Sequence, residues 1–146
     1  MRSYQYKILA WLRYALAVSL SFGVFSFVVF FQISSFPYAT EKEYYLYSPS
    51  SQAQIKTELS VDDLLYIKGE CAKIETSDGE NCLQELIARY AANVIKIEQF
   101  DGGMSYYCYS SKLKTPILLD GAYVNLHIVV KEKEILIATP LVFGGY

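Results

Sequence analysis

The feature that most constrains this chain is an uncharged run close to its N-terminus. From Tyr14 to Ile33 the sequence reads YALAVSLSFGVFSFVVFFQI, twenty residues without a charged side chain. At about 1.5 Å of rise per residue, a helix of this length covers about 30 Å, the thickness of a bilayer's hydrocarbon core. Trp11 lies just before the run and Tyr38 just after it, and membrane interfaces favour such aromatic rings. The run predicts one transmembrane helix over residues 14–33, with the lipid bilayer as its partner.

The charges around this run predict its orientation. Arg2, Lys7 and Arg13 all precede it, and the first charges after it lie at residues 41–43. By the positive-inside rule, residues 1–13 form a cytoplasmic tail and the rest of the chain lies outside a bacterial cell membrane. The alternative is a cleaved signal peptide, whose apolar region is usually about 7–15 residues and ends at small residues. Because this run is longer, we expect an uncleaved, single-pass anchor.

Three small residues share one face of the expected helix. Ala15, Ser19 and Gly23 are spaced four apart, and small residues at this spacing let two helices approach closely. They predict a homodimer formed through the helix. The alternative is that small residues are simply common in such helices.

The rest of the chain is acidic. Residues 34–146 hold ten of the thirteen Lys and Arg residues and all fifteen Asp and Glu residues. Nucleic-acid binding needs clustered Lys and Arg to meet the phosphates, and no such cluster is present in the sequence. We therefore expect no nucleic-acid partner.

Residues 34–42 read as a short polar linker, in which Pro37 blocks continuation of the helix. Residues 43–146 then form one domain. Within it, Ser77 and Glu80 fit a capping box at the start of an amphipathic helix. Apolar residues follow at helical spacing, namely Leu83, Leu86, Ile87, Tyr90 and Val94. Asn93 is the residue that we expect in a left-handed conformation at the end of this helix.

Strand patterns surround the predicted helix. Residues 43–47 and 64–75 precede it, and residues 94–100, 104–109, 123–130 and 135–139 follow it. Asp101-Gly102 separates two of these runs, which is a strong hairpin signal. Consecutive hairpins beside one helix predict an α+β fold, an antiparallel sheet with one amphipathic helix packed on one face.

Three short segments resemble the YwmB-like family of bacterial extracytoplasmic proteins. They are SYYCYS at 105–110, VNLHI at 124–128 and ATPLV at 138–142. The resemblance covers about residues 80–142, and Ser111 stands where the family has proline. It implies a TATA-box-binding-like fold, in which a helix is followed by a curved antiparallel sheet. It implies no particular activity, because the family is largely without an assigned one.

Few residues offer chemistry. If the domain lies in an oxidising compartment, Cys71 and Cys82 are the pair that we expect to form a disulfide; the alternative is that all three cysteines are buried thiols. A lone His127 with no cysteine cluster predicts no metal site, and no motif predicts a cofactor. A thiol enzyme that pairs Cys108 with His127 is an alternative function, because a histidine can activate a thiol.

Tyrosines are the most unusual feature of the composition, with 14 in the chain. Alternation places Tyr45 with Tyr47 on one face of a strand, and Tyr107 with Tyr109 on one face of another. They are candidates for a binding face, or for cross-strand packing. We therefore expect a non-enzymatic binding or assembly module for an envelope protein or a wall component. A ligand-sensing domain is a further alternative.

Overall fold

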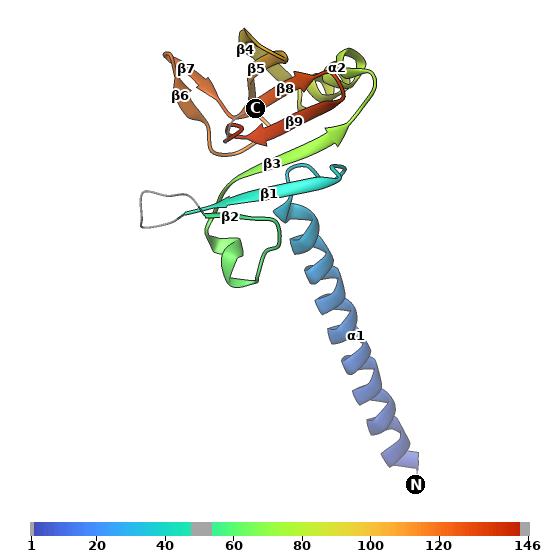
Figure 1. Cartoon of the computed structure of the whole chain (residues 1–146). Coiled ribbons are helices and arrows are strands. Elements are labelled where there is room, and N and C mark those ends of the chain that lie inside the picture. Colours follow the sequence, from blue (N-terminus) through green and yellow to red (C-terminus); the bar gives the residue numbers. More distant parts are fainter. Residues whose placement is uncertain (1, 48–53, 144–146) are drawn as a thin grey trace. The chain divides into compact units, whose positions relative to one another are not determined.

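The computed structural model describes the backbone of residues 2–47 and 54–143; within its first helix, the side chains of residues 7 and 11–26 are described. The chain divides into two compact units, residues 1–34 and 35–146. The first unit holds helix α1, Arg2–Ile33. The second holds one further helix, a short 3-10 turn and the strands (Figure 1).

The prediction of a transmembrane helix over residues 14–33 is wrong. In the parts of the chain that the structure describes, no helix combines the length and apolar character needed to cross a bilayer. The single-pass placement in a bacterial cell membrane, inferred from that helix, is wrong with it.

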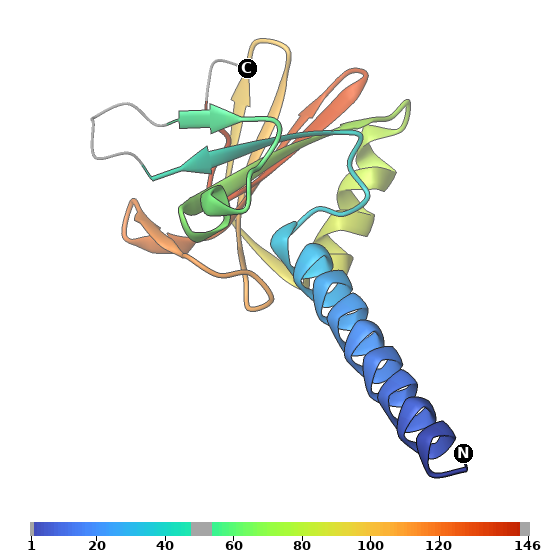
Figure 2. The same cartoon turned by 90° about the horizontal axis from the view of Figure 1, so that it is seen from below.

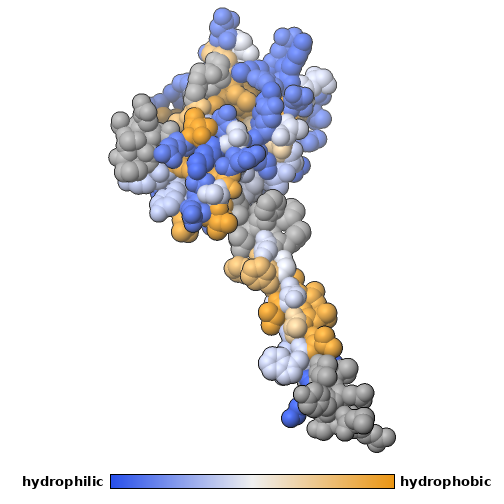
Figure 3. Space-filling view, turned by 60° about the horizontal axis from the view of Figure 1, so that its bottom comes forward, coloured by the Kyte–Doolittle hydropathy of each residue, from blue (hydrophilic) through white to orange (hydrophobic). Residues whose placement is uncertain are grey.

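Within α1 the small residues Ala15, Ser19 and Gly23 lie on one side and are exposed. Larger apolar side chains are exposed as well, including Trp11 and Phe22. Figure 3 shows hydrophobic residues on the described part of the helix. Pairing of α1 with a second helix stays a prediction.

The second unit confirms the predicted antiparallel sheet. Its strands are β1 (Glu41–Leu46), β2 (Gln54–Lys56), β3 (Ile67–Glu75), β4 (Ala92–Phe100), β5 (Gly103–Ser110), β8 (Leu126–Lys131) and β9 (Glu134–Thr139). They pair antiparallel in the order β2-β1-β3-β9-β8-β5-β4, and a separate hairpin joins β6 (Ile117–Leu119) to β7 (Ala122–Val124). The pairing of β3 with β9 joins the two ends of the domain sequence into one sheet (Figure 2).

Helix α2, Gly79–Tyr90, packs on one face of the sheet, which we call the helix face. Its cap differs from the prediction. Asp78 rather than Ser77 is the N-cap, because its carboxylate accepts a hydrogen bond from the Asn81 amide at 3.1 Å. Ala91, not Asn93, takes the left-handed conformation that ends the helix, so the chain enters β4 at residue 92.

Strand β3 also begins later than predicted. Residues 62–65 form the 3-10 turn, and the strand starts at Ile67. The carboxylate of Asp63 accepts hydrogen bonds from the Ser60 amide and from Lys56, which lies 2.7 Å away. These bonds close a local turn, a conformation that competes with an extended strand.

The segment predicted as a linker is part of the core. Phe36 is fully buried against the apolar cluster between α2 and the sheet, and its ring meets that of Tyr90 edge-on at 5.7 Å. The Tyr90 hydroxyl donates to the Ser35 carbonyl, and the Tyr38 hydroxyl donates to Tyr90, both at 2.7 Å. Residues 35–38 therefore cover one end of the helix-face core.

We expect Phe36→Ala to lower the free energy of unfolding by about 3–5 kcal/mol, because the truncation leaves a cavity in the core. Denaturant titration of the full chain measures the change. Val61→Ala is the matched control, since Val61 is 82% exposed and should change stability by less than about 0.5 kcal/mol. Equal stability of the two variants would contradict the packing of Phe36.

Candidate binding groove

The face of the sheet opposite α2 carries the features that suggest binding. Alternation turns every second side chain of each strand to this face. The strand registers align one row of residues across it, namely Glu43, Cys71, Ala138, His127, Tyr107 and Lys96. The row brings together residues from β1 to β4 that lie far apart in sequence.

Residues 140–143, which we call the tail, cross this face, which we call the tail face. Val142 packs against Tyr45, Cys71 and Ala138. The Tyr45 hydroxyl donates to the carbonyl of Phe143 at 3.2 Å, and the two rings lie 4.9 Å apart. Gly69 of β3 allows the backbone of Thr139, just before this segment, to lie close to the strand. A Cβ at residue 69 would collide with the carbonyl oxygen of Thr139.

His127 fastens the tail to the sheet. Its Nδ1 accepts a hydrogen bond from the Val142 amide at 3.1 Å, so in the neutral ring the proton lies on Nε2. Nε2 then donates to the Ser105 hydroxyl, 2.6 Å away. The Tyr107 ring stacks on the imidazole at 4.3 Å, and its hydroxyl donates to Glu98. Burial lowers the pKa of His127 to about 4, which keeps the ring neutral near pH 7.

The structure does not bring Cys108 and His127 together. Cys108 pairs in register with Leu126 and points into the helix-face core, whereas His127, the next residue, points to the tail face. Burial raises the pKa of the Cys108 thiol to about 11. Ser105 receives its hydrogen bond from His127, so this histidine does not act as a base toward it. In this geometry His127 therefore activates neither Cys108 nor Ser105 as a nucleophile.

Cys71 and Cys82 also lie apart. Cys71 sits under Val142 on the tail face, while Cys82 packs against the helix-face core. The sheet therefore separates the two sulfurs, and all three cysteines are free thiols in the structure.

The predicted tyrosine face is divided. Tyr45 and Tyr107 are on the tail face, where they hold the tail and His127 as described above. Tyr47 is 58% exposed, with the Lys68 ammonium 5.7 Å from its ring. Tyr109 is 37% exposed and lies on β5, several strands away from Tyr45 on β1. Two of the four rings thus serve packing, and the other two do not meet.

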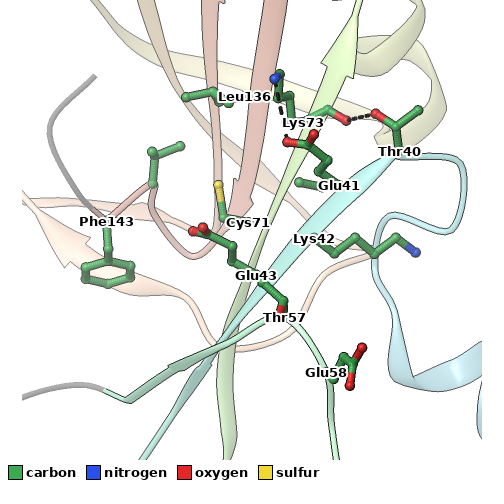
Figure 4. A pocket seen from close by; sticks show the side chains of 12 residues that line it. Thr40, Glu41, Lys42, Glu43, Thr57, Glu58, Cys71, Lys73, Leu136 and Phe143 are labelled. Carbon is green, nitrogen blue, oxygen red and sulfur yellow. Dashed lines mark hydrogen bonds and ion pairs between the residues drawn. The ribbon is translucent and has the colours of Figure 1, made fainter.

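A groove opens where β2 ends. Strand β2 pairs with β1 only at residues 44–46, while β3 pairs with β1 from Glu41. Along residues 41–43, no strand in the described chain occupies the outer side of β1. The groove has a volume of about 560 Å³, and Figure 4 shows its lining. Its lining includes Glu41, Glu43, Glu58, Cys71, Lys73 and Phe143.

The groove has an apolar floor and acidic walls. Cys71, Leu136 and the tail residues Val142 and Phe143 supply the apolar surface. Lys73 lies within 4.0 Å of three carboxylates, those of Glu41, Glu75 and Glu134. These neighbours, led by Glu41, raise the pKa of Lys73 and keep it charged.

Two carboxylates of the groove have no such partner. Among the described side chains, no Lys or Arg lies within ion-pair distance of Glu43 or Glu58. In Figure 4 the side chain of Glu43 points toward Cys71 and Phe143, whereas Lys42 points away. The sequence reasoning missed this site, although the alternation of Glu41, Lys42 and Glu43 predicts two acids on one face of a strand.

Comparison with protein-family models, with curated proteins and with solved structures gives no match to this chain. The resemblance to the YwmB-like family stays a prediction.

We expect acid to destabilise the fold through His127, the only histidine in the chain. Its folded pKa of about 4 lies below the unfolded value of 6.5, so the unfolded state binds more protons between these pH values. Stability is complete above pH 6.5 and falls as the pH drops, by about 2 kcal/mol between pH 7 and pH 5. Denaturant titration at each pH measures this loss.

His127→Gln is the matched variant, because glutamine keeps an N–H donor for Ser105 but does not titrate. Its stability should change much less over the same pH interval, even if it is lower throughout. Carboxylates whose pKa is lowered, such as Glu98 and Glu134, act mainly below this interval and are shared by both proteins. A wild-type profile as flat as that of the variant would refute the buried neutral histidine.

We expect three titratable thiols per chain when protein purified without reductant is denatured and treated with a thiol reagent. The reason is that Cys71 and Cys82 lie on opposite faces of the sheet. Cys82, the least buried, should react first in the folded protein. A count of one thiol would instead establish the disulfide.

Proposed function

We propose that residues 35–146 form a binding module whose groove takes an extended, basic peptide segment of a partner protein. One observation carries this proposal. In the described chain no strand pairs with the outer side of β1 along residues 41–43, and the nearby carboxylates of Glu43 and Glu58 form no ion pair with a described side chain. The proposal keeps the expectation of a non-enzymatic binding module and names the chemistry of its partner.

The free edge favours a peptide over an isolated small molecule. Strand β1 continues beyond the end of β2, and residues 57–58 turn away from it. No described strand pairs with this side of β1, and a strand edge of this kind can pair with an added strand. An extended segment here would continue the line of β2, which is the mode called β-strand addition.

The charges favour a basic segment. Lys73 is already held by Glu41, Glu75 and Glu134, so it does not neutralise the remaining carboxylates. An Arg or Lys side chain of the added segment that points into the groove would lie near Glu43 and Glu58. Because the site is open to water, each ion pair is worth about 0.2–1 kcal/mol and is weakened by salt.

The proposal is tested with fluorescent peptides in which Arg or Lys alternates with Val or Thr. Anisotropy with the full chain should show saturable binding that weakens as salt is raised. A peptide with Glu in place of the basic residues should not bind. N-methylation of alternate backbone nitrogens should also abolish binding, since it removes the donors that an added strand needs.

The double variant Glu43→Gln/Glu58→Gln should weaken binding about three- to tenfold, by loss of two exposed ion pairs. Glu132→Gln is the control, because Glu132 is exposed between β8 and β9 and does not line the groove. The proposal would be refuted if the double variant bound the basic peptide as tightly as the wild type does. It would also be refuted if basic and acidic peptides bound equally well.

A further inference from the structure

The other edge of the sheet is the longer one. β4 spans Ala92–Phe100 and is the last strand of the sheet, so in the described chain no strand pairs with its outer side. Apolar side chains are exposed along it, with Val94 at 40% and Ile97 at 53%. A long exposed edge of this kind is a template for pairing with another strand.

Two features of β4 limit how a strand can pair with it. A bulge lies between Val94 and Lys96, where one extra residue interrupts the ladder with β5. The regular part of the strand is therefore Lys96–Phe100. Within it stand two opposite charges, Lys96 and Glu98, which both point to the tail face because they pair with Tyr107 and Ser105.

We propose that β4 is the interface between two copies of this chain, which pair antiparallel about a two-fold axis at Ile97. In this register Lys96 of each copy lies opposite Glu98 of the other. The two Ile97 side chains meet on the helix face. The sequence Lys96-Ile97-Glu98 is thus complementary to itself when it is reversed, and this charge complementarity selects a second copy as the occupant.

The backbone permits this register. When two copies of β4 pair antiparallel about Ile97, the numbers of two facing residues always differ by an even number, as those of Lys96 and Glu98 do. Outward-facing N–H and C=O groups alternate along a strand, so outward groups of one copy face outward groups of the other. The hydrogen-bond ladder between the two copies can therefore form whether the odd-numbered or the even-numbered residues of β4 direct their backbone groups outward.

The existing contacts of Lys96 agree with the arrangement. Its ammonium lies 2.8 Å from Glu98 and 2.7 Å from Asp120, which reaches it from the β6–β7 turn. In the proposed register, an added strand would place the partner's Glu98 beside the same ammonium. A lysine on an edge often prevents pairing, but here the facing carboxylate removes that penalty.

The interface is short, so the dimer is expected to depend on protein concentration. Backbone pairing and the contact between Ile97 side chains supply the affinity, while the exposed ion pairs supply the register. Other partners for this edge, such as an unrelated extended peptide, would not require both charges.

Disulfide trapping tests the register in the full chain. Detergent keeps the exposed apolar side chains of α1 covered. Ile97→Cys should form a disulfide-linked dimer on mild oxidation, because facing Cα atoms are about 4.5–5.5 Å apart. Gln99→Cys is the matched variant; its partner position is residue 95, so it should yield several-fold less dimer. Any dimer formed by wild-type chain, through its own thiols, is subtracted.

Charge exchange provides the second test. Lys96→Glu alone and Glu98→Lys alone each place like charges opposite one another, so each variant should be monomeric by sedimentation. An equimolar mixture of the two should form a heterodimer, because the charges are again opposite. The double variant Lys96→Glu/Glu98→Lys should recover the homodimer. Near-ultraviolet circular dichroism of each variant checks that it is folded.

Three results would overturn the proposal. They are a wild-type chain that sediments as a monomer at all concentrations without trapping at residue 97, equal trapping at residues 97 and 99, and single variants that dimerise as well as wild type. Association through α1 alone would give the last two results, since such a dimer does not depend on the register of β4. These tests do not involve the groove, so their failure leaves the peptide-binding proposal intact.

Discussion

Burial of the central strands on both faces is the constraint on which the rest of the domain depends. In β8, residues 126–129 are all buried, with Leu126 and Ile128 on the helix face and His127 and Val129 on the tail face. A strand buried on both sides needs cover on both sides. Helix α2 and Phe36 supply it on one face, and residues 140–143 supply it on the other. The tail is therefore a structural layer of the domain.

A polar residue in such a strand has to be fully hydrogen-bonded. His127 meets this requirement with the Val142 amide on one nitrogen and the Ser105 hydroxyl on the other. The same bonds that satisfy the ring position the tail, and the tail in turn supplies Val142 and Phe143 to the groove floor. The buried histidine thus acts on the candidate site through the tail and not through acid–base chemistry.

The two proposals arise from the two edges of one sheet. At one edge the described part of β2 pairs with β1 only at residues 44–46, beside two carboxylates that form no ion pair with a described side chain. At the other, β4 is long and carries one lysine and one glutamate around Ile97. The short edge offers a place for a basic segment, and the long edge offers a surface that is complementary to itself. An antiparallel sheet that does not close always has two such edges, and their side chains decide which partner each can accept.

Local patterns predicted the elements that depend on neighbouring residues. The spacing of Leu83, Leu86 and Tyr90 predicted α2, and alternation around Asp101-Gly102 predicted the β4–β5 hairpin. Errors arose where distant contacts or competing local bonds decide. Phe36 reads as part of a linker until the core that buries it is known, and the uncharged run after Tyr14 led to a membrane placement that the described helix does not support.

The sequence by itself therefore determined the α+β class, the antiparallel hairpins and the acidic character of the domain, because these follow from periodicity and composition. Only the tertiary structure decided which side chains meet. Cys108 and His127 are separated by the sheet, whereas Glu43, Cys71 and His127 fall in one row across it. The reason is that strand order and register join residues far apart in the chain, and a shift of one residue would turn each of them to the other face.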